Sequence, residues 1–418
     1  MNDMTRPLAL PEPSTLEAFL RRRLLAQLAP LQGGRLQLRD ALGDVSIGDA
    51  AAPLQVTVWV DNPAFYRAVG AQGSVGAGEA YIRGEWRCDN LVGLVQLLVR
   101  NRALLDGMER GPARLGGWLL QGWNWLRRNT REGSRRNIAA HYDLGNAFFS
   151  LFLSRDLMYS SALYTEPGDT LEVASQRKLA RICEQLQLKP GDRVVEIGTG
   201  WGGFAVYAAL HHGCHVTTTT ISREQYALAT ERVASAGLQD KVTVLLEDYR
   251  DLEGQYDKLV SIEMIEAIGA QYLDTYFATL TRLLKPEGLA LLQAITIEDE
   301  RYEQARRSVD YIKRFVFPGS FIPSLHAIMA AKTRSSDLQL IGQHDFGQSY
   351  ALTLRAWRLR FLSQLPAVRA QGFDERFIRL WEFYLAYCEG GFLERSIGVS
   401  QLLLARPGYR PAPLDGTH

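Results

Sequence analysis

The chain lacks the features of a disulfide framework, a zinc site or a membrane span. Its 418 residues include only four cysteines, Cys88, Cys183, Cys214 and Cys388, with no C-x-x-C pair. The formal net charge is +1, so no global field favours nucleic acid, and we expect no nucleic-acid partner. The sequence does not open with basic residues followed by an apolar run, so we expect no secretory signal. It contains no run of about 18 apolar residues, so we expect no membrane-spanning helix. These absences favour a cytoplasmic protein.

The length of the chain allows roughly two to three domains. Composition divides it into four parts, of which two are domains. Residues 1–13 carry three prolines and are expected to be a disordered lead-in. Residues 14–110 predict a small α+β domain, because a helical pattern over 14–32 is followed by alternating strands over 35–88 and by a second helical stretch. Residues 111–137 form a separate element, and residues 138–410 form the largest domain.

The element at 111–137 is rich in tryptophan and arginine. Trp118, Trp123 and Trp125 lie among leucines, and a cluster of arginines follows: Arg127, Arg128, Arg131, Arg135 and Arg136. One interpretation is a linker helix packed between domains. The other is an interfacial element whose tryptophans lie among lipid headgroups and whose arginines meet anionic lipid.

From about residue 170 to 300, helical and strand patterns alternate. The strand candidates are DRVVEIG, CHVTTTTIS, KVTVLLED, YDKLVSIE and EGLALLQAI, with helical segments between them. This alternation is typical of a parallel, doubly wound α/β sheet.

A glycine-rich turn follows the first of these strands. Glu196, Gly198, Gly200 and Gly202 give E-x-G-x-G-x-G, where glycines let the backbone approach a ligand closely. The spacing differs from the G-x-G-x-x-G of dinucleotide folds, no acid follows about 20 residues on, and no P-loop ending is present. An acid before the glycines favours a cationic ligand, and Asp248 after the third strand could meet an adenine amine at the same edge of the sheet. We therefore predict binding of S-adenosylmethionine (SAM).

Several segments in order carry a more specific resemblance. HYDLGN and YSSALY precede EIGTGWGG, and TISREQ, LLEDYRDL, SIEMIEAIG and LLKPEG follow it. Over about residues 135–405 the chain resembles the cyclopropane-fatty-acid synthase family with its mycolic-acid methyltransferase relatives; residues 14–110 are similar, more loosely, to the extra N-terminal domain of the bacterial synthases.

The resemblance implies a fold, a reaction and partners. The fold is the class I SAM methyltransferase fold, an α/β fold with a mostly parallel seven-stranded sheet and lipid-binding helical insertions. The reaction is transfer of a methyl group from SAM to the cis double bond of an unsaturated phospholipid acyl chain, followed by proton loss from the resulting carbocation to close a cyclopropane ring. The implied enzyme acts on the phospholipid membrane surface as a peripheral protein at the cytoplasmic inner face, and a homodimer is compatible with the family.

Motif matching assigns the SAM site. Besides Glu196, it consists of Tyr159, Ser160, Gly198, Gly200, Thr220, Gln225, Asp248 and Tyr249. For Tyr159 the alternative is a core tyrosine, and for Thr220 and Gln225 it is a helix cap with a solvated helix residue.

The resemblance also implies a bicarbonate ion as base, held by a cage that this chain keeps only in part. Glu266, the backbone of Ile295 and Tyr350 match the family, whereas Ser161 replaces a cysteine and Gln293 replaces a histidine. Serine and glutamine can donate hydrogen bonds to an anion, but glutamine cannot titrate. Ring-free methylation of a fatty acyl chain is therefore the main alternative product, and a non-catalytic lipid-binding relative is a third hypothesis.

Three further features have two interpretations each. Tyr142 could stabilise the carbocation with its ring or simply pack. Cys388 matches a segment associated with family activity, yet a buried structural cysteine explains it as well. Residues 311–325 could line the acyl channel or form ordinary core.

Overall fold

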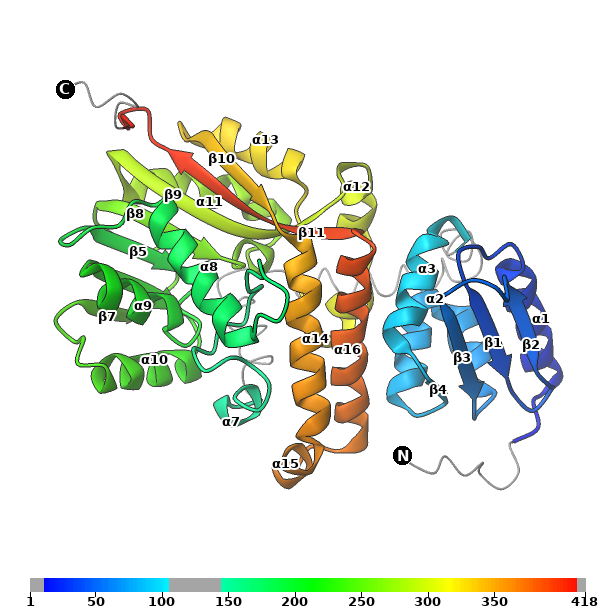
Figure 1. Ribbon diagram of the computed structural model, residues 1–418. Coiled ribbons are helices and arrows are strands. Elements are labelled where there is room, and N and C mark those ends of the chain that lie inside the picture. The colour runs from blue at the N-terminus through cyan, green and yellow to red at the C-terminus, as the bar shows by residue number, and fades with distance from the viewer. Residues whose placement is uncertain (1–10, 105–143, 412–418) are drawn as a thin grey trace. The chain divides into compact units, whose positions relative to one another are not determined.

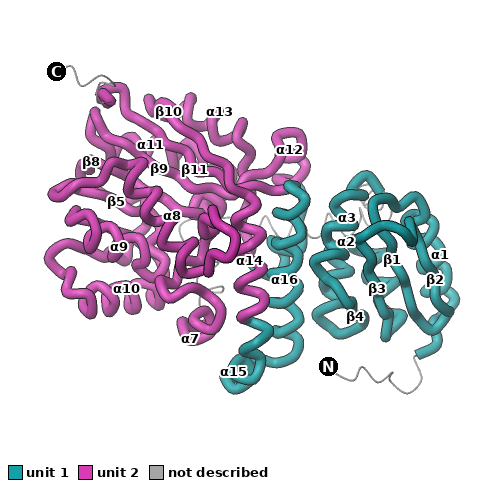
Figure 2. The backbone as a smooth tube through the Cα atoms, viewed as in Figure 1, with its two compact units in different colours: residues 1–126, 308–316, 361–396 teal, residues 127–307, 317–360, 397–418 magenta. Residues whose placement is uncertain are grey.

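The computed structural model describes residues 11–104 and 144–411 and contains two compact units (Figure 1, Figure 2). Most of the proline-rich lead-in, the whole 111–137 element and Tyr142 lie outside the described residues. Each unit is described by itself.

The N-terminal part of unit 1 is a small α+β fold, as predicted. Its elements are α1 (Thr15–Leu28), β1 (Arg35–Arg39), β2 (Val45–Gly48), β3 (Gln55–Val60), α2 (Ala64–Ile82), β4 (Trp86–Cys88) and α3 (Leu91–Arg100). The sheet order is β2-β1-β3-β4, with β1 parallel to β3 and the other pairs antiparallel. Helix α1 starts at a capping box, in which Ser14 and Glu17 bond each other's backbone N–H.

Unit 1 also includes residues 308–316 and 361–396, with α15 (Leu365–Ala370) and α16 (Glu375–Leu393). Arg379 of α16 donates hydrogen bonds to the carbonyl oxygens of Tyr81 and Trp86, at 2.5 Å each. Gly390 lies so close to α3 that a Cβ there would come 2.6 Å from Val95 Cγ1. The N-terminal fold is therefore completed by segments that the sequence analysis placed in the 138–410 domain, because α16 packs on α2 and α3.

Unit 2 is a seven-stranded α/β fold, and its predicted strands are all confirmed. The strands are β5 (Arg193–Ile197), β6 (His215–Thr220), β7 (Val242–Leu246), β8 (Tyr256–Ile262), β9 (Leu284–Ile297), β10 (Gln339–Asp345) and β11 (Ile397–Ala405). Their order is β10-β11-β9-β8-β5-β6-β7, and only β11 is antiparallel to its neighbours.

Helices cover both faces of this sheet (Figure 1). They are α7 (Asn146–Phe149), α8 (Leu171–Gln185), α9 (Gly203–His212), α10 (Arg223–Ser235), α11 (Leu273–Leu283), α12 (Asp299–Arg307), α13 (Leu325–Ser335) and α14 (Gly347–Ser363). Successive strand residues enter opposite core layers, since Val194 packs with Phe204 of α9 and Val195 with Leu280 of α11. Central strands covered on both faces explain the nearly continuous apolar runs of β5 and β9.

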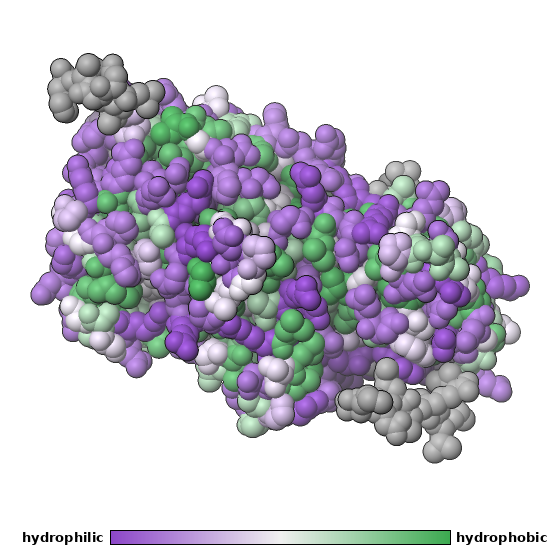
Figure 3. All heavy atoms as spheres, in the orientation of Figure 1, coloured by the Kyte–Doolittle hydropathy of each residue, from purple (hydrophilic) through white to green (hydrophobic). Residues whose placement is uncertain are grey.

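The surface mixes polar and apolar residues. In the view of Figure 3 apolar side chains form separate groups within a mostly hydrophilic face. Within the described residues, no helix combines the length and hydropathy needed to cross a bilayer.

Candidate active site

A glycine and three polar residues lie at the carboxyl ends of four neighbouring parallel strands of unit 2. Gly198 follows β5, Thr220 ends β6, Asp248 follows β7 and Glu263 follows β8. Because β5 to β8 are parallel neighbours, these positions share one edge of the sheet. Ligands of open α/β sheets bind at this carboxyl edge.

The glycine turn has backbone angles that favour glycine. The φ angles of Gly198, Gly200 and Gly202 are +99°, +52° and +82°. A Cβ at Gly198 would come 3.1 Å from Met264 Cγ, so the turn leaves little room beside the backbone. Asn146 supports the turn from α7, because its Oδ1 accepts a hydrogen bond of 2.7 Å from the Trp201 indole N–H. The predicted turn between β5 and α9 is confirmed.

The predicted SAM-binding residues after β6 and β7 are buried or partly buried. Thr220 donates a hydrogen bond to Gln225 Oε1 at 2.7 Å, which joins the strand end to the first turn of α10. Arg250 binds both carboxylate oxygens of Asp248, at 2.8 and 2.7 Å. The neighbouring Tyr249 hydroxyl is buried and has no hydrogen-bond partner among the described residues, so it is free to bind a ligand.

Glu196 has a partner within the sheet. Its Oε2 accepts a hydrogen bond of 2.6 Å from Thr218 on β6, and burial raises the pKa of Glu196 to about 8. The Thr218 hydrogen bond gives Glu196 a role in joining β5 to β6. Its contact with a cationic ligand stays a prediction.

An aromatic cluster surrounds Tyr159. Ring centroids of Phe149 and Trp357 both lie 5.3 Å from that of Tyr159, and those of Phe317 and Trp201 lie 6.3 and 6.5 Å away. Aromatic faces attract cations, so this cluster offers a wall suited to a sulfonium or a carbocation. Within the predicted acyl-channel segment, Phe317 belongs to the cluster, and Phe321 donates its backbone N–H to the Glu266 carbonyl oxygen at 3.0 Å.

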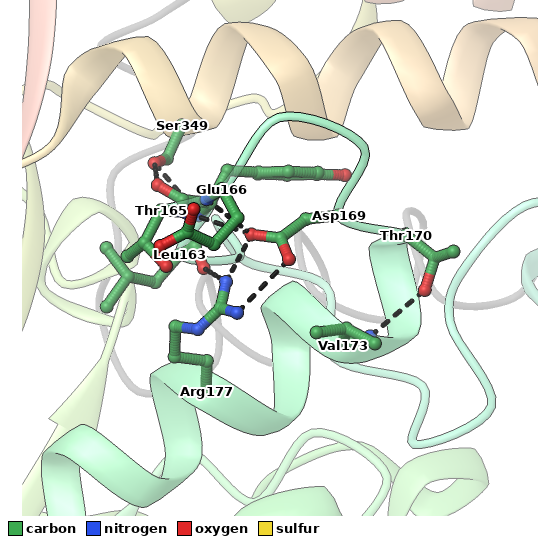
Figure 4. Close-up of polar contacts among 9 residues, drawn as sticks. Leu163, Thr165, Glu166, Asp169, Thr170, Val173, Arg177 and Ser349 are labelled. Atoms are coloured by element: carbon green, nitrogen blue, oxygen red, sulfur yellow. Dashed lines mark hydrogen bonds and ion pairs between the residues drawn. The ribbon is translucent and has the colours of Figure 1, made fainter.

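The segment that carries Tyr159, Ser160 and Ser161 is held against α14. Ala162 N–H donates to Thr353 Oγ1 of α14 at 3.0 Å, and Tyr164 N–H donates to Ser349 Oγ at 3.1 Å. Figure 4 shows how the segment then turns into α8, where the Asp169 carboxylate accepts from two backbone N–H groups and from Arg177. These contacts fix where the Ser161 backbone lies.

A carboxylate that the sequence analysis did not select lies at the centre of the predicted anion cage. Glu263 Oε1 accepts hydrogen bonds from Ser161 N–H at 2.9 Å and from Gln293 Nε2 at 2.7 Å. Glu263 Oε2 accepts one from the Tyr350 hydroxyl at 2.7 Å. Burial raises the pKa of Glu263, and these hydrogen bonds and the charge of Lys178 act in the opposite direction.

The rest of the predicted cage binds a second carboxyl group. Ile295 N–H donates to Glu266 Oε1 at 2.5 Å, and Glu266 Oε2 is buried with no hydrogen-bond partner among the described residues. Burial and the charge of Glu263 raise the pKa of Glu266 to about 8. The Ser161 hydroxyl donates to its neighbour's carbonyl, so Ser161 serves the cage through its backbone.

A buried lysine compensates the negative charge of this region. Lys178 of α8 donates a hydrogen bond of 2.7 Å to Ser160 Oγ and has no exposed surface. Burial lowers the pKa of Lys178 to about 8, against the attraction of Glu263, Asp156 and Glu196. The predicted SAM-binding Ser160 is thus also the anchor of a cation.

Two further residues, Tyr142 and Cys388, were predicted to be catalytic. Tyr142 lies outside the described residues, so its role stays a prediction. Cys388 lies on α16 in unit 1, whereas the site belongs to unit 2, and burial raises the pKa of its thiol. A high thiol pKa favours the structural interpretation of Cys388.

Comparisons with known proteins identify the class. A mostly parallel seven-stranded sheet with this glycine turn defines a SAM-dependent methyltransferase fold, and solved structures agree. The cyclopropane synthase MmaA2 from Mycobacterium tuberculosis has a TM-score of 0.61 at 26% identity, covering 65% of this chain and 98% of its own. A crystal structure of mycolic acid cyclopropane synthase CmaA1, complexed with SAH (S-adenosylhomocysteine) and CTAB, gives the same values.

The sequence comparisons identify the family. Residues 129–402 match the family described as mycolic acid cyclopropane synthetase. Tuberculostearic acid methyltransferase UfaA1 of Mycobacterium tuberculosis is 37% identical over 94% of this chain and 92% of its own length. Cyclopropane-fatty-acyl-phospholipid synthase of Escherichia coli K12 is 39% identical over 88% of this chain and 92% of its own. The chain belongs to the mycolic acid cyclopropane synthetase family, which confirms the resemblance drawn from its motifs.

Proposed function

We propose that the protein is a SAM-dependent enzyme that adds a methylene unit to the cis double bond of an unsaturated phospholipid acyl chain and forms a cyclopropane. The observation that carries this proposal is the glycine turn after β5 beside the aromatic cluster of Tyr159, Trp201 and Trp357. The family supplies the substrate class, since relatives that match most of this chain are named for cyclopropane synthesis and fatty-acid methylation.

The residues at the carboxyl edge fit SAM. The positive φ angles of the glycine turn offer a close backbone approach. The Tyr249 hydroxyl, which has no hydrogen-bond partner within residues 11–104 and 144–411, offers a polar atom. Gly198, Gly200, Thr220 and Gln225 would hold it, together with Tyr159, Ser160, Asp248 and Tyr249. SAM supplies an electrophilic methyl group.

The chain's own residues protect the cationic reaction centre. The aromatic cluster presents ring faces instead of water, so a carbocation on the acyl chain is stabilised and is not hydrated. Lys178 and Ser160 fix the backbone next to Tyr159, which keeps the ring in place.

Bicarbonate, expected from the family, does not fit this site. Of the donors predicted for it, Gln293, Tyr350 and Ile295 N–H already bond to the Glu263 and Glu266 carboxyl groups. The predicted Ser161 hydroxyl donates to the Ala162 carbonyl oxygen. We assign no step to bicarbonate.

Ring-free methylation is the second candidate. It is favoured by Ser161 and Gln293, which depart from the family cage, and by the UfaA1 relative, which is named as a tuberculostearic acid methyltransferase. Both candidates share the transfer of the methyl group and differ in which proton leaves.

The proposal includes peripheral attachment to the inner face of the membrane. The 111–137 element carries three tryptophans and a cluster of arginines, a composition suited to an anionic lipid surface. A homodimer is proposed from the family only.

The test is mass spectrometry of lipids after incubation of the purified protein with methyl-deuterated SAM and vesicles of unsaturated phospholipid. A product that keeps two deuteriums and resists hydrogenation supports cyclopropane formation with proton loss from the new methyl group. A product that keeps three deuteriums supports the ring-free reaction. Absence of label from the lipid contradicts both and favours a non-catalytic lipid-binding protein.

A further inference from the structure

The three described hydrogen-bond donors around Glu263 come from three separated parts of unit 2. The Ser161 N–H belongs to the segment between α7 and α8, Gln293 to β9 and Tyr350 to α14, while Glu263 follows β8. An ionised carboxylate offers about four lone-pair positions, and the described hydrogen bonds use three of them. One position is left for a proton.

A chain of hydrogen bonds orients the Gln293 amide so that its NH2 group donates to Glu263. Arg181 can only donate, and its Nε donates to Gln401 Oε1 at 3.1 Å. Gln401 Nε2 therefore faces Gln293 Oε1, at 3.1 Å, and the Gln293 NH2 group faces Glu263. The arrangement requires an acceptor at Glu263, as a carboxylate provides.

The backbone of Glu263 has a conformation that favours glycine. Its φ angle is +50°, in the left-handed region that residues other than glycine rarely adopt. Such strain persists where surrounding contacts fix the residue, and it concentrates at functional sites. Here the side-chain carboxylate is what the surrounding donors hold.

We propose that Glu263 is the catalytic base and stands where the family places a bicarbonate ion; this inference rests on the proposed function. Once the acyl chain has received the methyl group, one C–H bond of that group breaks. Its electron pair forms the C–C bond that closes the ring at the cationic carbon, and the proton goes to a carboxylate oxygen of Glu263. The resulting carboxylic acid releases this proton to solvent before the next turnover. Turnover therefore needs no dissolved bicarbonate.

The experiment compares the wild-type protein with Glu263→Gly in carbonate-free buffer under argon, with and without added sodium bicarbonate. The assay is the transfer of deuterated methyl groups from SAM to unsaturated phospholipid vesicles. Wild-type rates are expected to agree within about twofold, whereas Glu263→Gly falls by about 100-fold or more, as for loss of a general base. Glycine suits the φ of this position, so the variant is expected to fold, which circular dichroism checks.

Bicarbonate is expected to raise the rate of Glu263→Gly by about tenfold or more, because the anion can then reach the freed donors. Sodium nitrate is the anion control, since it is planar and singly charged but a very weak base. Glu263→Asp should keep part of the activity without bicarbonate. Glu263→Gln should lose activity, and bicarbonate should not restore it, because the glutamine side chain still fills the place of the carboxylate.

Gln187→Gly is the matched control variant. Gln187 also has a positive φ, +53°, but it is exposed and remote in sequence from the donors of Glu263. Its activity is expected to match the wild type in both buffers.

The outcomes separate this inference from the function on which it rests. A wild-type enzyme that methylates lipid only with bicarbonate would overturn the role of Glu263 and leave the proposed function standing. Failure of bicarbonate to restore folded Glu263→Gly, or equal restoration by nitrate, would also overturn the role as base. Absence of label in wild-type samples in every buffer would overturn the proposed function and this inference together.

Discussion

At the scale of single residues, Glu266 is a carboxyl group whose environment differs strongly from water. Its pKa rises from 4.5 to about 8 because it is buried and lies near Glu263. A group that binds its proton more tightly in the folded protein stabilises the fold below its unfolded pKa. This contribution is lost as the pH rises through the folded pKa.

We therefore expect Glu266→Gln to flatten the pH dependence of stability. Between pH 5 and pH 8 the wild-type free energy of unfolding should fall relative to the variant by on the order of 2 kcal/mol. Urea unfolding at several pH values measures this difference. The control is Glu287→Gln, at an exposed position. Parallel curves for wild type and Glu266→Gln would contradict the shifted pKa.

Tyr350→Phe removes one donor to Glu263 and keeps the ring. A hydrogen bond to a charged group contributes about 1.5–3 kcal/mol, so we expect kcat to fall by roughly 10- to 100-fold. SAH affinity, measured by calorimetry, should stay within about twofold of wild type. Tyr409→Phe is the control, because it removes a hydroxyl that accepts a hydrogen bond from the exposed Gln187. Unchanged kcat in Tyr350→Phe would show that this hydrogen bond does not orient the Glu263 carboxylate.

At the scale of elements, the turn between β5 and α9 presents backbone to the site. The φ of Gly198 is +99°, and the space beside it is limited by Met264. A side chain at Gly198 would strain the backbone and would also push the turn away from the ligand. At a glycine of positive φ with open space around its Cβ position, a side chain would only strain the backbone.

Gly198→Ala tests this difference against Gly237→Ala. Gly237 has a φ of +66° with open space around the position of its Cβ. Both variants should lose about 1 kcal/mol of stability from the positive φ. Only Gly198→Ala should weaken SAH binding, by about tenfold or more in calorimetry. Equal affinities would mean that the turn does not contact the ligand.

The elements were more predictable than the carboxylate at their centre. The strands β5 to β9 and the glycine turn follow from local apolar patterns and glycine spacing, which act within a few residues. Glu263 was missed because its role depends on Ser161, Gln293 and Tyr350, which lie far apart in sequence. The available indication was an acid placed directly after a buried apolar strand in VSIE. The role of α16 was missed for the same reason, since its amphipathic pattern does not say which unit it joins.

At the scale of the whole molecule, unit 2 carries the candidate active site and the 111–137 element carries the proposed membrane contact. The arginines at 127, 128, 135 and 136 lie outside the described residues. Each basic residue near an anionic bilayer contributes about 1 kcal/mol of binding free energy.

Replacing these four arginines by glutamine should weaken binding to anionic phosphatidylserine vesicles by about tenfold or more, as measured by co-sedimentation. Binding to neutral phosphatidylcholine vesicles is the control and should change little. Arg306→Gln with Arg307→Gln, on α12, is a second control that removes two surface charges elsewhere. Unchanged binding to anionic vesicles would favour the linker interpretation of residues 111–137.

The order of elements along the chain also governs how the protein is made. Helix α16 and strand β11 are the last elements in sequence, yet α16 packs on α2 and α3, and β11 lies between β9 and β10. During synthesis on the ribosome, the first residues of unit 1 must therefore wait for almost the whole chain before their apolar surface is covered. A nonsense mutation before α16 should therefore leave both units incomplete, although most of the chain would already have been made.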